Sequence, residues 1–228
     1  MQAVIQKKTQ RVIGIMGGTF NPIHYGHLRM AQELAESLNL DEVCFIPAAS
    51  PPHKSEPEIS AEHRATMVQL GIANNPVFKF DDRELHRLGA SYTVDTLLSL
   101  RHELGHEVSL ILLMGSDAFT KFNTWHRWQE IIQLCHIALV QRPLAATHHV
   151  STPKEPLPKV LETFLHNHYT ENSAELRESP TGWVNMQQVT ALDISSTAIR
   201  NCIQNKHSTR YLMPDSVIDY IQANKLYT

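Results

Sequence analysis

Two histidines three positions apart, His24 and His27, follow a glycine pair near the start of the 228-residue chain. The segment 17–27 reads GGTFNPIHYGH, with an apolar run at 12–16 before it and a helical pattern at 28–38 after it. This order predicts a strand, a glycine turn and a helix N-terminus. A helix N-terminus offers unpaired N–H groups and the positive end of its dipole. The segment therefore predicts a phosphate-binding site with two imidazoles at the helix entry.

Other interpretations of this segment compete with phosphate binding. A tight turn also explains a glycine pair, and neither GxGxxG nor GxxxxGK[ST] is present. A zinc pair is disfavoured because no third cysteine, histidine or carboxylate stands at a recognisable spacing from His24 and His27. Surface placement remains a simple alternative in a chain with 14 histidines.

A second polar segment, DISSTAIR at 193–200, lies about 170 residues further on. Ser195, Ser196 and Thr197 place three hydroxyl groups at the predicted start of a helix. One hydroxyl would cap the helix, and the simplest interpretation stops there, with Arg200 in solvent. However, Ser196 and Arg200 are four residues apart and share one helix face. A hydroxyl, free N–H groups and a guanidinium would together bind an oxyanion.

The elements that must position these residues follow a regular order over the first 140 residues. Apolar strand patterns alternate with helical patterns, which predicts a parallel sheet with right-handed crossovers, the doubly wound class of α/β fold. Beyond the sheet we expect a helical C-terminal part. The expected strands are 12–16, 43–46, 77–80, 108–114, 135–140 and 183–186. The expected helices are 28–38, 60–72, 93–104, a short helix end from 131, 160–168, 195–204 and 215–224.

Length and composition favour one domain spanning residues 1–228. We expect a flexible tail at 1–10 and a polar, proline-rich surface loop at 145–158. The stretch beyond that loop is too short to form a separate core. The hydrophobic content of 42% is ordinary for a globular chain.

Charge and apolar patterning exclude several classes of function. The formal net charge of −3 offers no global attraction for nucleic acid. The N-terminus lacks the apolar core of a signal peptide, and no apolar stretch approaches a membrane span. Three cysteines without paired spacing, Cys44, Cys135 and Cys202, suit a reducing compartment. We therefore expect a cytoplasmic protein that binds neither nucleic acid nor membrane and uses local positive groups for an anionic substrate.

The two polar segments together resemble the two signature motifs of the nucleotidylyltransferase superfamily, (H/T)xGH and ISSTxxR. The pieces between them resemble the bacterial nicotinate mononucleotide adenylyltransferases, over nearly the whole chain and most weakly at 145–180. The resemblance implies a Rossmann-like fold. The matching pieces are GGTFNPIH at 17–24, PPHK at 51–54, REL at 83–85, SYT at 91–93, GSD at 115–117, Trp125, and RP at 142–143.

This resemblance implies transfer of AMP from ATP to the 5′-phosphate of nicotinate mononucleotide, which yields nicotinate adenine dinucleotide and pyrophosphate in NAD biosynthesis. The attacking phosphate is already ionised, so catalysis would consist mostly of positioning and charge stabilisation. Mg²⁺ is expected to arrive with ATP, held by phosphates, water and one or two carboxylates. The sequence shows no dedicated metal-binding cage, and we assign no metal ligand from it.

On the ATP side the resemblance implies a catalytic set of His24, His27 and Arg200, with His27 at the α-phosphate. The hydroxyls and the guanidinium of the second segment would hold the phosphates that leave as pyrophosphate, and Asp117 would lie by the adenosine ribose. The full expected ATP site is Gly17, Gly18, Thr19, Phe20, His24, His27, Gly115, Asp117, Ile194, Ser195, Ser196, Thr197 and Arg200.

The expected acceptor site is Thr19, Lys54, Tyr92, Thr93, Trp125 and Arg142. The N–H groups at the helix start of Thr93 would receive the nicotinate carboxylate, the group that separates the acid from the amide. Trp125 would stack on the pyridine ring, although core packing is an equal alternative and Trp128 an equal candidate for either role. Lys54 and Arg142 have simpler alternatives as a solvated loop lysine and an ion-pair partner.

Three hypotheses remain open from the sequence. The first is the nicotinate enzyme, which His24 and the chain length favour over phosphopantetheine adenylyltransferase, usually a shorter protein with threonine at the first histidine position. The second keeps AMP transfer and changes the acceptor to nicotinamide mononucleotide or phosphopantetheine. The third is a non-catalytic nucleotide-binding sensor, which the presence of both histidines, Ser196 and Arg200 disfavours. The sequence carries no indication of oligomeric state.

Overall fold

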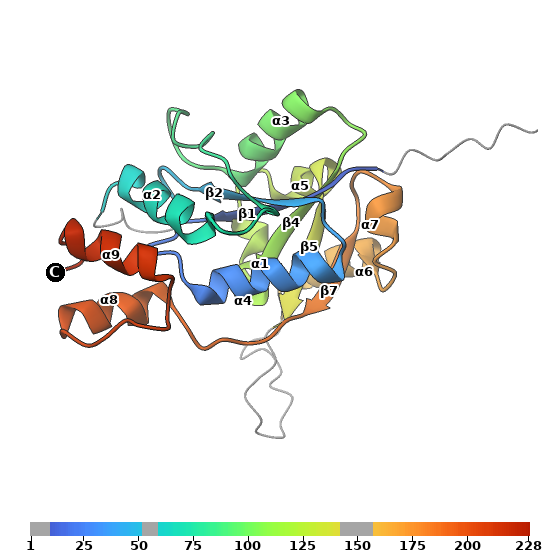
Figure 1. Ribbon diagram of the computed structural model, residues 1–228. Helices are drawn as coiled ribbons and strands as arrows, with labels where there is room; N and C mark the ends of the chain where they lie inside the picture. Colours follow the sequence, from blue (N-terminus) through green and yellow to red (C-terminus); the bar gives the residue numbers. More distant parts are fainter. Residues whose placement is uncertain (1–9, 52–58, 142–156) are drawn as a thin grey trace, which may run out of the picture.

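A seven-stranded parallel sheet forms the centre of the computed structural model, which describes residues 10–51, 59–141 and 157–228 (Figure 1). The strands are β1 (Val12–Gly18), β2 (Glu42–Pro47), β3 (Phe78–Phe80), β4 (Ser109–Gly115), β5 (His136–Gln141), β6 (Tyr169–Thr170) and β7 (Val184–Gln188). Their order is β3-β2-β1-β4-β5-β7-β6, and each pair of neighbours runs parallel. This confirms the predicted doubly wound α/β class, and the direction of winding reverses between β1 and β4.

Helices cover both faces of the sheet. They are α1 (Tyr25–Ser37), α2 (Ala61–Ile72), α3 (Thr93–Leu104), α4 (Ser116–Phe119), the 3-10 helix η1 (Phe122–Thr124), α5 (Trp128–Leu134), α6 (Lys159–His168), α7 (Glu175–Glu178), α8 (Ser196–Gln204) and α9 (Asp215–Ala223). One face packs against α1, α2, α8 and α9, and the other against α3, α4, α5 and α6. The C-terminal helices α8 and α9 lie together at one end of the molecule, with α9 packed against α2 (Figure 1).

The strands are buried on both faces because successive side chains enter opposite cores. In β1, Val12 and Met16 pack into the core beneath α1 and α2, whereas Ile13 and Ile15 pack into the core beneath α3 and α5. This explains why the strands read as continuous apolar runs in the sequence. No helix in the described parts of the chain combines the length and hydropathy that a membrane span requires.

Each strand and helix expected from the sequence is present, with its ends shifted by a few residues. The main correction concerns Gly17 and Gly18, for which the sequence predicts a turn. Both residues belong to the end of β1 and pair with Ile46 and Pro47 of β2. The additional elements α4, η1, α7 and β6 are too short to give a periodic pattern.

The carboxyl ends of the strands carry most of the predicted site residues. Thr19 and Phe20 follow β1, and Gly115 is the last residue of the neighbouring strand β4. Open parallel sheets bind ligands at this edge, where the direction of winding reverses. The fold therefore places the candidate site over β1 and β4.

Candidate active site

His24 and His27 stand at the first turn of α1, beside the loop that leaves β1. His24 is the N-cap residue, and its side chain does not cap the helix. The two rings stack with their centroids 3.7 Å apart and 27° between their planes, and His24 is buried. The ring of Phe20 packs against His27 in a T-shaped contact at 5.2 Å. Two rings thus orient His27 at a helix N-terminus, where the N–H groups and the dipole favour an anion.

Gly26 lies between the two histidines and was not among the residues predicted for the site. A Cβ on this residue would lie 3.0 Å from two atoms of the His24 ring and 3.4 Å from the carbonyl oxygen of Ile194. A side chain at this position would crowd the His24 ring, and glycine leaves room for that ring beside the backbone of α1. The position of Gly26 between the two histidines was the available signal in the sequence.

The turn after β1 depends on Phe20 rather than on the two glycines. Phe20 has a φ of +45°, in the left-handed region that residues other than glycine rarely adopt. Its ring is buried beside Gly18, where a Cβ would come within 3.0 Å of the ring. Gly17 has open space where a side chain would be. The glycines keep the end of β1 open and make room for the ring, while Phe20 supplies the unusual backbone.

The two polar segments, far apart in the sequence, are in direct contact. Ser196 Oγ donates to the carbonyl oxygen of Pro22 at 2.9 Å. Arg200 Nη1 donates to the carbonyl oxygen of Asn21 at 2.8 Å. Both carbonyls belong to the loop between β1 and α1. The N-terminus of α8 and the N-terminus of α1 therefore lie at the same loop.

The hydroxyl groups of the second segment have different partners. Ser195 caps α8, because its Oγ accepts from the backbone N–H of Ala198 at 3.1 Å. Ser196 gives its hydrogen to the loop after β1 and so joins the two segments. Thr197 Oγ1 accepts a long bond from Arg200 Nη2, at 3.4 Å. An anion at this helix start would meet the first-turn N–H groups and the guanidinium.

Tyr92 and Thr93 stand at the start of α3, as the sequence predicts. Tyr92 is the N-cap residue, and its side chain does not cap the helix. Its ring stacks on His126, with the centroids 4.3 Å apart and 29° between the planes. This contact brings the segment that carries Trp125 to the start of α3. The sequence did not predict a role for His126, because the contact joins two segments with no common pattern.

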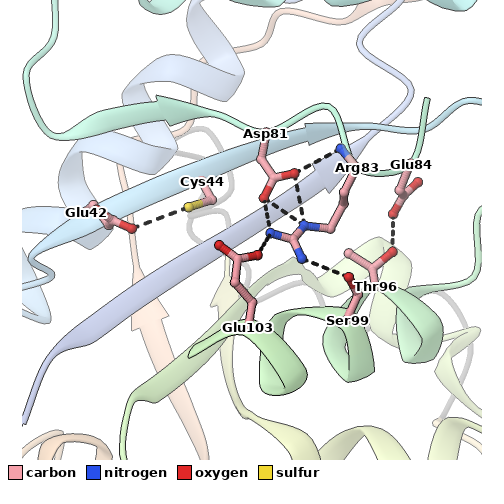
Figure 2. Close-up of polar contacts among 8 residues, drawn as sticks. All are labelled: Glu42, Cys44, Asp81, Arg83, Glu84, Thr96, Ser99 and Glu103. Carbon is pink, nitrogen blue, oxygen red and sulfur yellow. Dashed lines mark hydrogen bonds and ion pairs between the residues drawn. The ribbon is translucent and has the colours of Figure 1, made fainter. Parts of the chain in front are cut away.

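Charged side chains hold the segment before α3 against that helix. Arg83 Nε donates to both carboxylate oxygens of Asp81, at 2.9 and 2.8 Å. The same guanidinium binds Ser99 at 3.0 Å and Glu103 at 2.9 Å, both on α3 (Figure 2). One arginine thus joins the end of β3 to the exposed side of α3.

Glu84 is buried below the start of α3. Thr96 Oγ1 donates to Glu84 Oε1 at 2.6 Å, and Arg87 Nη2 donates to Thr96 Oγ1 at 3.1 Å (Figure 2 shows the first bond). Burial raises the pKa of Glu84, while hydrogen bonds with Thr96 and Ser91 and the nearby Arg87 act in the opposite direction. Glu84 therefore holds Thr96, in the first turn of α3.

The two tryptophans have different surroundings, although both are partly buried. Trp128 packs against Phe122 and Phe164, with ring centroids 5.5 Å apart in each T-shaped contact. Among the described ring contacts Trp125 has one, to Phe122 at 5.6 Å. Trp128 is held between two core rings, which makes Trp125 the better candidate for stacking on a ligand.

The remaining predicted residues lie at a strand end or outside the described residues. Gly115 ends β4, and Asp117 is exposed in α4 at the carboxyl edge of the sheet. Lys54 and Arg142 lie outside the described residues, and their contacts stay predictions. Within 10–51, 59–141 and 157–228, no group of three or more His, Cys, Asp and Glu side chains could hold a metal ion.

Comparisons with known proteins agree with this geometry. The sequence profile of the family described as cytidylyltransferase-like matches residues 15–202. A relative from Dechloromonas aromatica, named "Probable nicotinate-nucleotide adenylyltransferase", is 44% identical over 215 residues, which cover 94% of this chain and 97% of the relative. A relative of the same name from Hydrogenovibrio crunogenus is 44% identical over 223 residues, 96% of this chain and 99% of the relative.

A solved structure shows the same fold at low sequence identity. The structure "Plasmodium falciparum nicotinic acid mononucleotide adenylyltransferase complexed with NaAD" has a TM-score of 0.69 and 19% identity, over 96% of this chain and 98% of that chain. At this identity the likeness concerns the fold alone. The sequence profile and the full-length relatives confirm the family resemblance of the two motifs: the chain belongs to the cytidylyltransferase-like family and, within it, to the nicotinate-nucleotide adenylyltransferases.

Proposed function

We propose that this site transfers AMP from ATP to nicotinate mononucleotide and releases nicotinate adenine dinucleotide and pyrophosphate. The contact between the two polar segments carries this proposal. Ser196 and Arg200 bind the loop that leads to the two histidines, so the N-termini of α1 and α8 border one site. Two helix N-termini with an arginine and an imidazole suit a triphosphate. The names of the full-length relatives support nicotinate mononucleotide as the acceptor.

The reaction forms one phosphorus–oxygen bond and breaks another. An oxygen of the 5′-phosphate of the acceptor attacks the α-phosphorus of ATP. The bond from that phosphorus to the oxygen that bridges to the β-phosphate breaks, and pyrophosphate leaves with its electron pair. Because the attacking group is already an anion, the site has to supply position and charge stabilisation rather than a base.

We assign the charge stabilisation to His27 and Arg200. His27 would donate a hydrogen bond to the α-phosphate as its bonds change, with His24 and Phe20 keeping its ring in place. Arg200 and the first-turn N–H groups of α8 would bind the two phosphates that leave. Each charge-assisted hydrogen bond of this kind contributes about 1.5–3 kcal/mol.

On the acceptor side we assign the N-terminus of α3 to the nicotinate carboxylate. The helix begins at Thr93, and Tyr92 leaves its first-turn N–H groups without a side-chain cap. Asp95 is acidic in this turn, but Arg127 lies 3.7 Å from its carboxylate and offsets the charge. Trp125 would stack on the pyridine ring, because its segment packs against the same helix start.

Other proposed contacts follow the family resemblance. Gly115 and Asp117 would bind the adenosine, and Lys54 and Arg142 would bind the mononucleotide. Mg²⁺ would enter with the triphosphate as part of the substrate. Phosphates, water and one or two carboxylates usually hold this ion.

A pyrophosphate-release assay with ATP and one acceptor at a time tests this function. We expect the fastest turnover with nicotinate mononucleotide. Faster turnover with nicotinamide mononucleotide would contradict the proposed contact between the nicotinate carboxylate and α3. Faster turnover with phosphopantetheine would show that the acceptor belongs to a different class. Nucleotide binding without turnover on any acceptor would identify a sensor. The His27→Ala protein, purified in the same way, controls for contaminating activity.

A further inference from the structure

A second arginine lies under the loop after β1, apart from the residues assigned to substrate. Arg64, in the first turn of α2, is 1% exposed. Its Nη1 donates to the carbonyl oxygens of Thr19 at 2.9 Å and Ala48 at 2.6 Å, and its Nη2 donates to that of Ala49 at 3.0 Å. Thr19 follows β1, whereas Ala48 and Ala49 follow β2. One guanidinium therefore joins the loops of two adjacent strands.

Backbone carbonyl groups bind Nη1 and Nη2 of Arg64, whereas its Nε is buried without a hydrogen-bond partner among the described residues. Among the same residues, no ion pair includes Arg64. Burial lowers the pKa of the guanidinium, which nevertheless stays charged. The charges of Tyr227 and Glu62 also favour the charged guanidinium. A buried cation is costly unless hydrogen bonds compensate for the lost water, and a hydrophobic side chain would fill the same space without that cost. The hydrogen bonds to the two loops are therefore the physical reason for an arginine at this position.

The bond to Thr19 lies next to a strained residue. Phe20 has its φ at +45°, a left-handed conformation that residues with a side chain rarely adopt. Such conformations persist where the surrounding contacts enforce them. Here Arg64 holds the carbonyl before Phe20, and Arg200 holds the carbonyl of Asn21 after it. Two arginines from different helices thus fix both sides of the strained residue.

The same segment that Arg64 binds also reaches the acceptor side. Ala49 gives its backbone N–H to Ser91 Oγ at 3.0 Å, and Ser50 gives its backbone N–H to the same oxygen at 3.2 Å. The backbone N–H of Ser91 donates in return to the carbonyl oxygen of Ser50 at 2.9 Å. Ser91 directly precedes Tyr92, the N-cap residue of α3. Hydrogen bonds therefore run from the phosphate side, through this segment, to the start of α3.

We propose that Arg64 is a positioning residue that keeps the loop after β1 in the conformation that supports His27 and couples this loop to the acceptor side through Ser91. Its guanidinium binds backbone carbonyls, so it acts through Phe20, whose ring packs against His27 at 5.2 Å. The inference rests on the proposed AMP transfer. Its physical basis is that a misplacement of about 1 Å at a reacting centre can lower the rate roughly 100-fold.

Three variants test the proposal by kcat and by KM for ATP and for nicotinate mononucleotide. Arg64→Met removes the hydrogen bonds, and we expect kcat to fall about 10- to 100-fold. Arg64→Lys keeps the charge but cannot bind three carbonyls of two loops in the same planar geometry, so it should recover only part of the loss. Ser91→Ala removes the acceptor for two N–H groups and should raise KM for the mononucleotide more than KM for ATP.

Amide hydrogen exchange gives a readout independent of turnover. The N–H groups of Ala49 and Ser50 should exchange faster in Arg64→Lys and in Ser91→Ala, with the sheet amides unchanged. Arg101→Lys makes the same change at a buried arginine on the other side of the sheet. It should leave kcat, KM and these two amides close to wild type, and it therefore controls for a general loss of packing.

Several results would overturn the positioning role. Arg64→Lys with the wild-type kcat would show that charge alone suffices, and unchanged kinetics in Arg64→Met would show that Arg64 is only structural. If Arg64→Met does not fold, the kinetics and amide exchange of Arg64→Lys and Ser91→Ala test the positioning role instead. A wild-type protein without turnover would refute AMP transfer itself. An active wild type with an equally active Arg64→Lys would refute only the role of Arg64.

Discussion

Two buried arginines bind backbone carbonyl groups at opposite edges of the sheet. Arg64 binds the loops that leave β1 and β2, at the carboxyl edge. Arg101, which is 5% exposed, donates to the carbonyls of Leu134 at 2.8 Å, Val108 at 2.7 Å and Pro180 at 3.0 Å. These carbonyls precede β5, β4 and β7, so they lie at the amino edge.

The same type of contact has different consequences at the two edges. Burial lowers the pKa of both arginines, and carbonyl oxygens compensate in both cases. At the carboxyl edge the bound loops also carry a strained backbone and N–H groups for a ligand. At the amino edge the bound segments only connect helices to strands. We therefore expect changes at the carboxyl edge to alter rate and substrate binding, and changes at the amino edge to alter stability.

The largest effect is expected at His27. His27→Ala should lower kcat about 10²- to 10³-fold, the usual cost of losing a donor that stabilises charge in the transition state. Thermal unfolding should change little, because the ring lies at the surface of the site and is only partly buried. Pyrophosphate release and a melting curve on the same preparation measure both. A kcat within about threefold of wild type, under roughly 1 kcal/mol in the barrier, would remove His27 from its role.

Arg101→Met tests the expectation that changes at the amino edge alter stability. The change leaves several carbonyls without their donor, and each buried unsatisfied acceptor costs about 1–3 kcal/mol. We expect the free energy of unfolding to fall by about 3 kcal/mol, which for a chain of this size lowers the melting temperature by about 6–12 °C. The kinetic constants of the folded fraction should stay near wild type. A selective loss of kcat with unchanged stability would contradict the division between the two edges.

His136, the first residue of β5, makes the stability of the amino edge depend on pH. Its Nδ1 accepts from the backbone N–H of Trp183 at 3.1 Å, and its Nε2 donates to the carbonyl of Ser179 at 2.9 Å, so the folded chain requires the neutral ring. Burial lowers the pKa of His136 from 6.5 to about 4. The unfolded chain therefore takes up the proton first. The stabilisation is complete above about pH 6.5 and is lost progressively down to about pH 4.

Urea unfolding between pH 7.5 and pH 4 measures this effect. A shift of this size corresponds to about 3 kcal/mol at the acid end, since one pKa unit is about 1.4 kcal/mol. His136→Gln retains a hydrogen-bond donor and does not titrate. The contributions of all other titrating groups therefore cancel when the unfolding free energies of the two proteins are subtracted. We expect the variant to show a shallower decline of stability with falling pH. Parallel curves for the two proteins would contradict the assignment.

The smallest expected effect is a difference in KM between variants of the two tryptophans. Trp125→Ala should raise KM for nicotinate mononucleotide about two- to tenfold, because ring stacking contributes roughly 0.5–1.5 kcal/mol. Trp128→Ala should lower the melting temperature with little change in KM, since two core rings hold Trp128. Steady-state kinetics and melting curves on both variants test the pair. The reverse pattern would assign the pyridine contact to Trp128.

Much of the fold was predictable because its elements are local patterns. The buried strands appear as apolar runs, and alternation with helical patterns implies a parallel sheet. The polar segments at 17–27 and 193–200 were recognisable because their residue types bind oxyanions at helix starts. The end of β1 was misjudged, since Gly17 and Gly18 read as a turn but pair with β2. Strand pairing, and not local preference, decided their conformation.

The sequence by itself determined the order of elements, the family and the side chains able to carry charge to a phosphate. Only the tertiary structure showed the contacts of Arg64 and His126, because their partners come from other segments. Arg64 binds carbonyl groups 15, 16 and 45 residues away. Every residue has a carbonyl group, so no spacing marks the ones that a buried arginine will bind. Folding alone decides which backbone groups come within its reach.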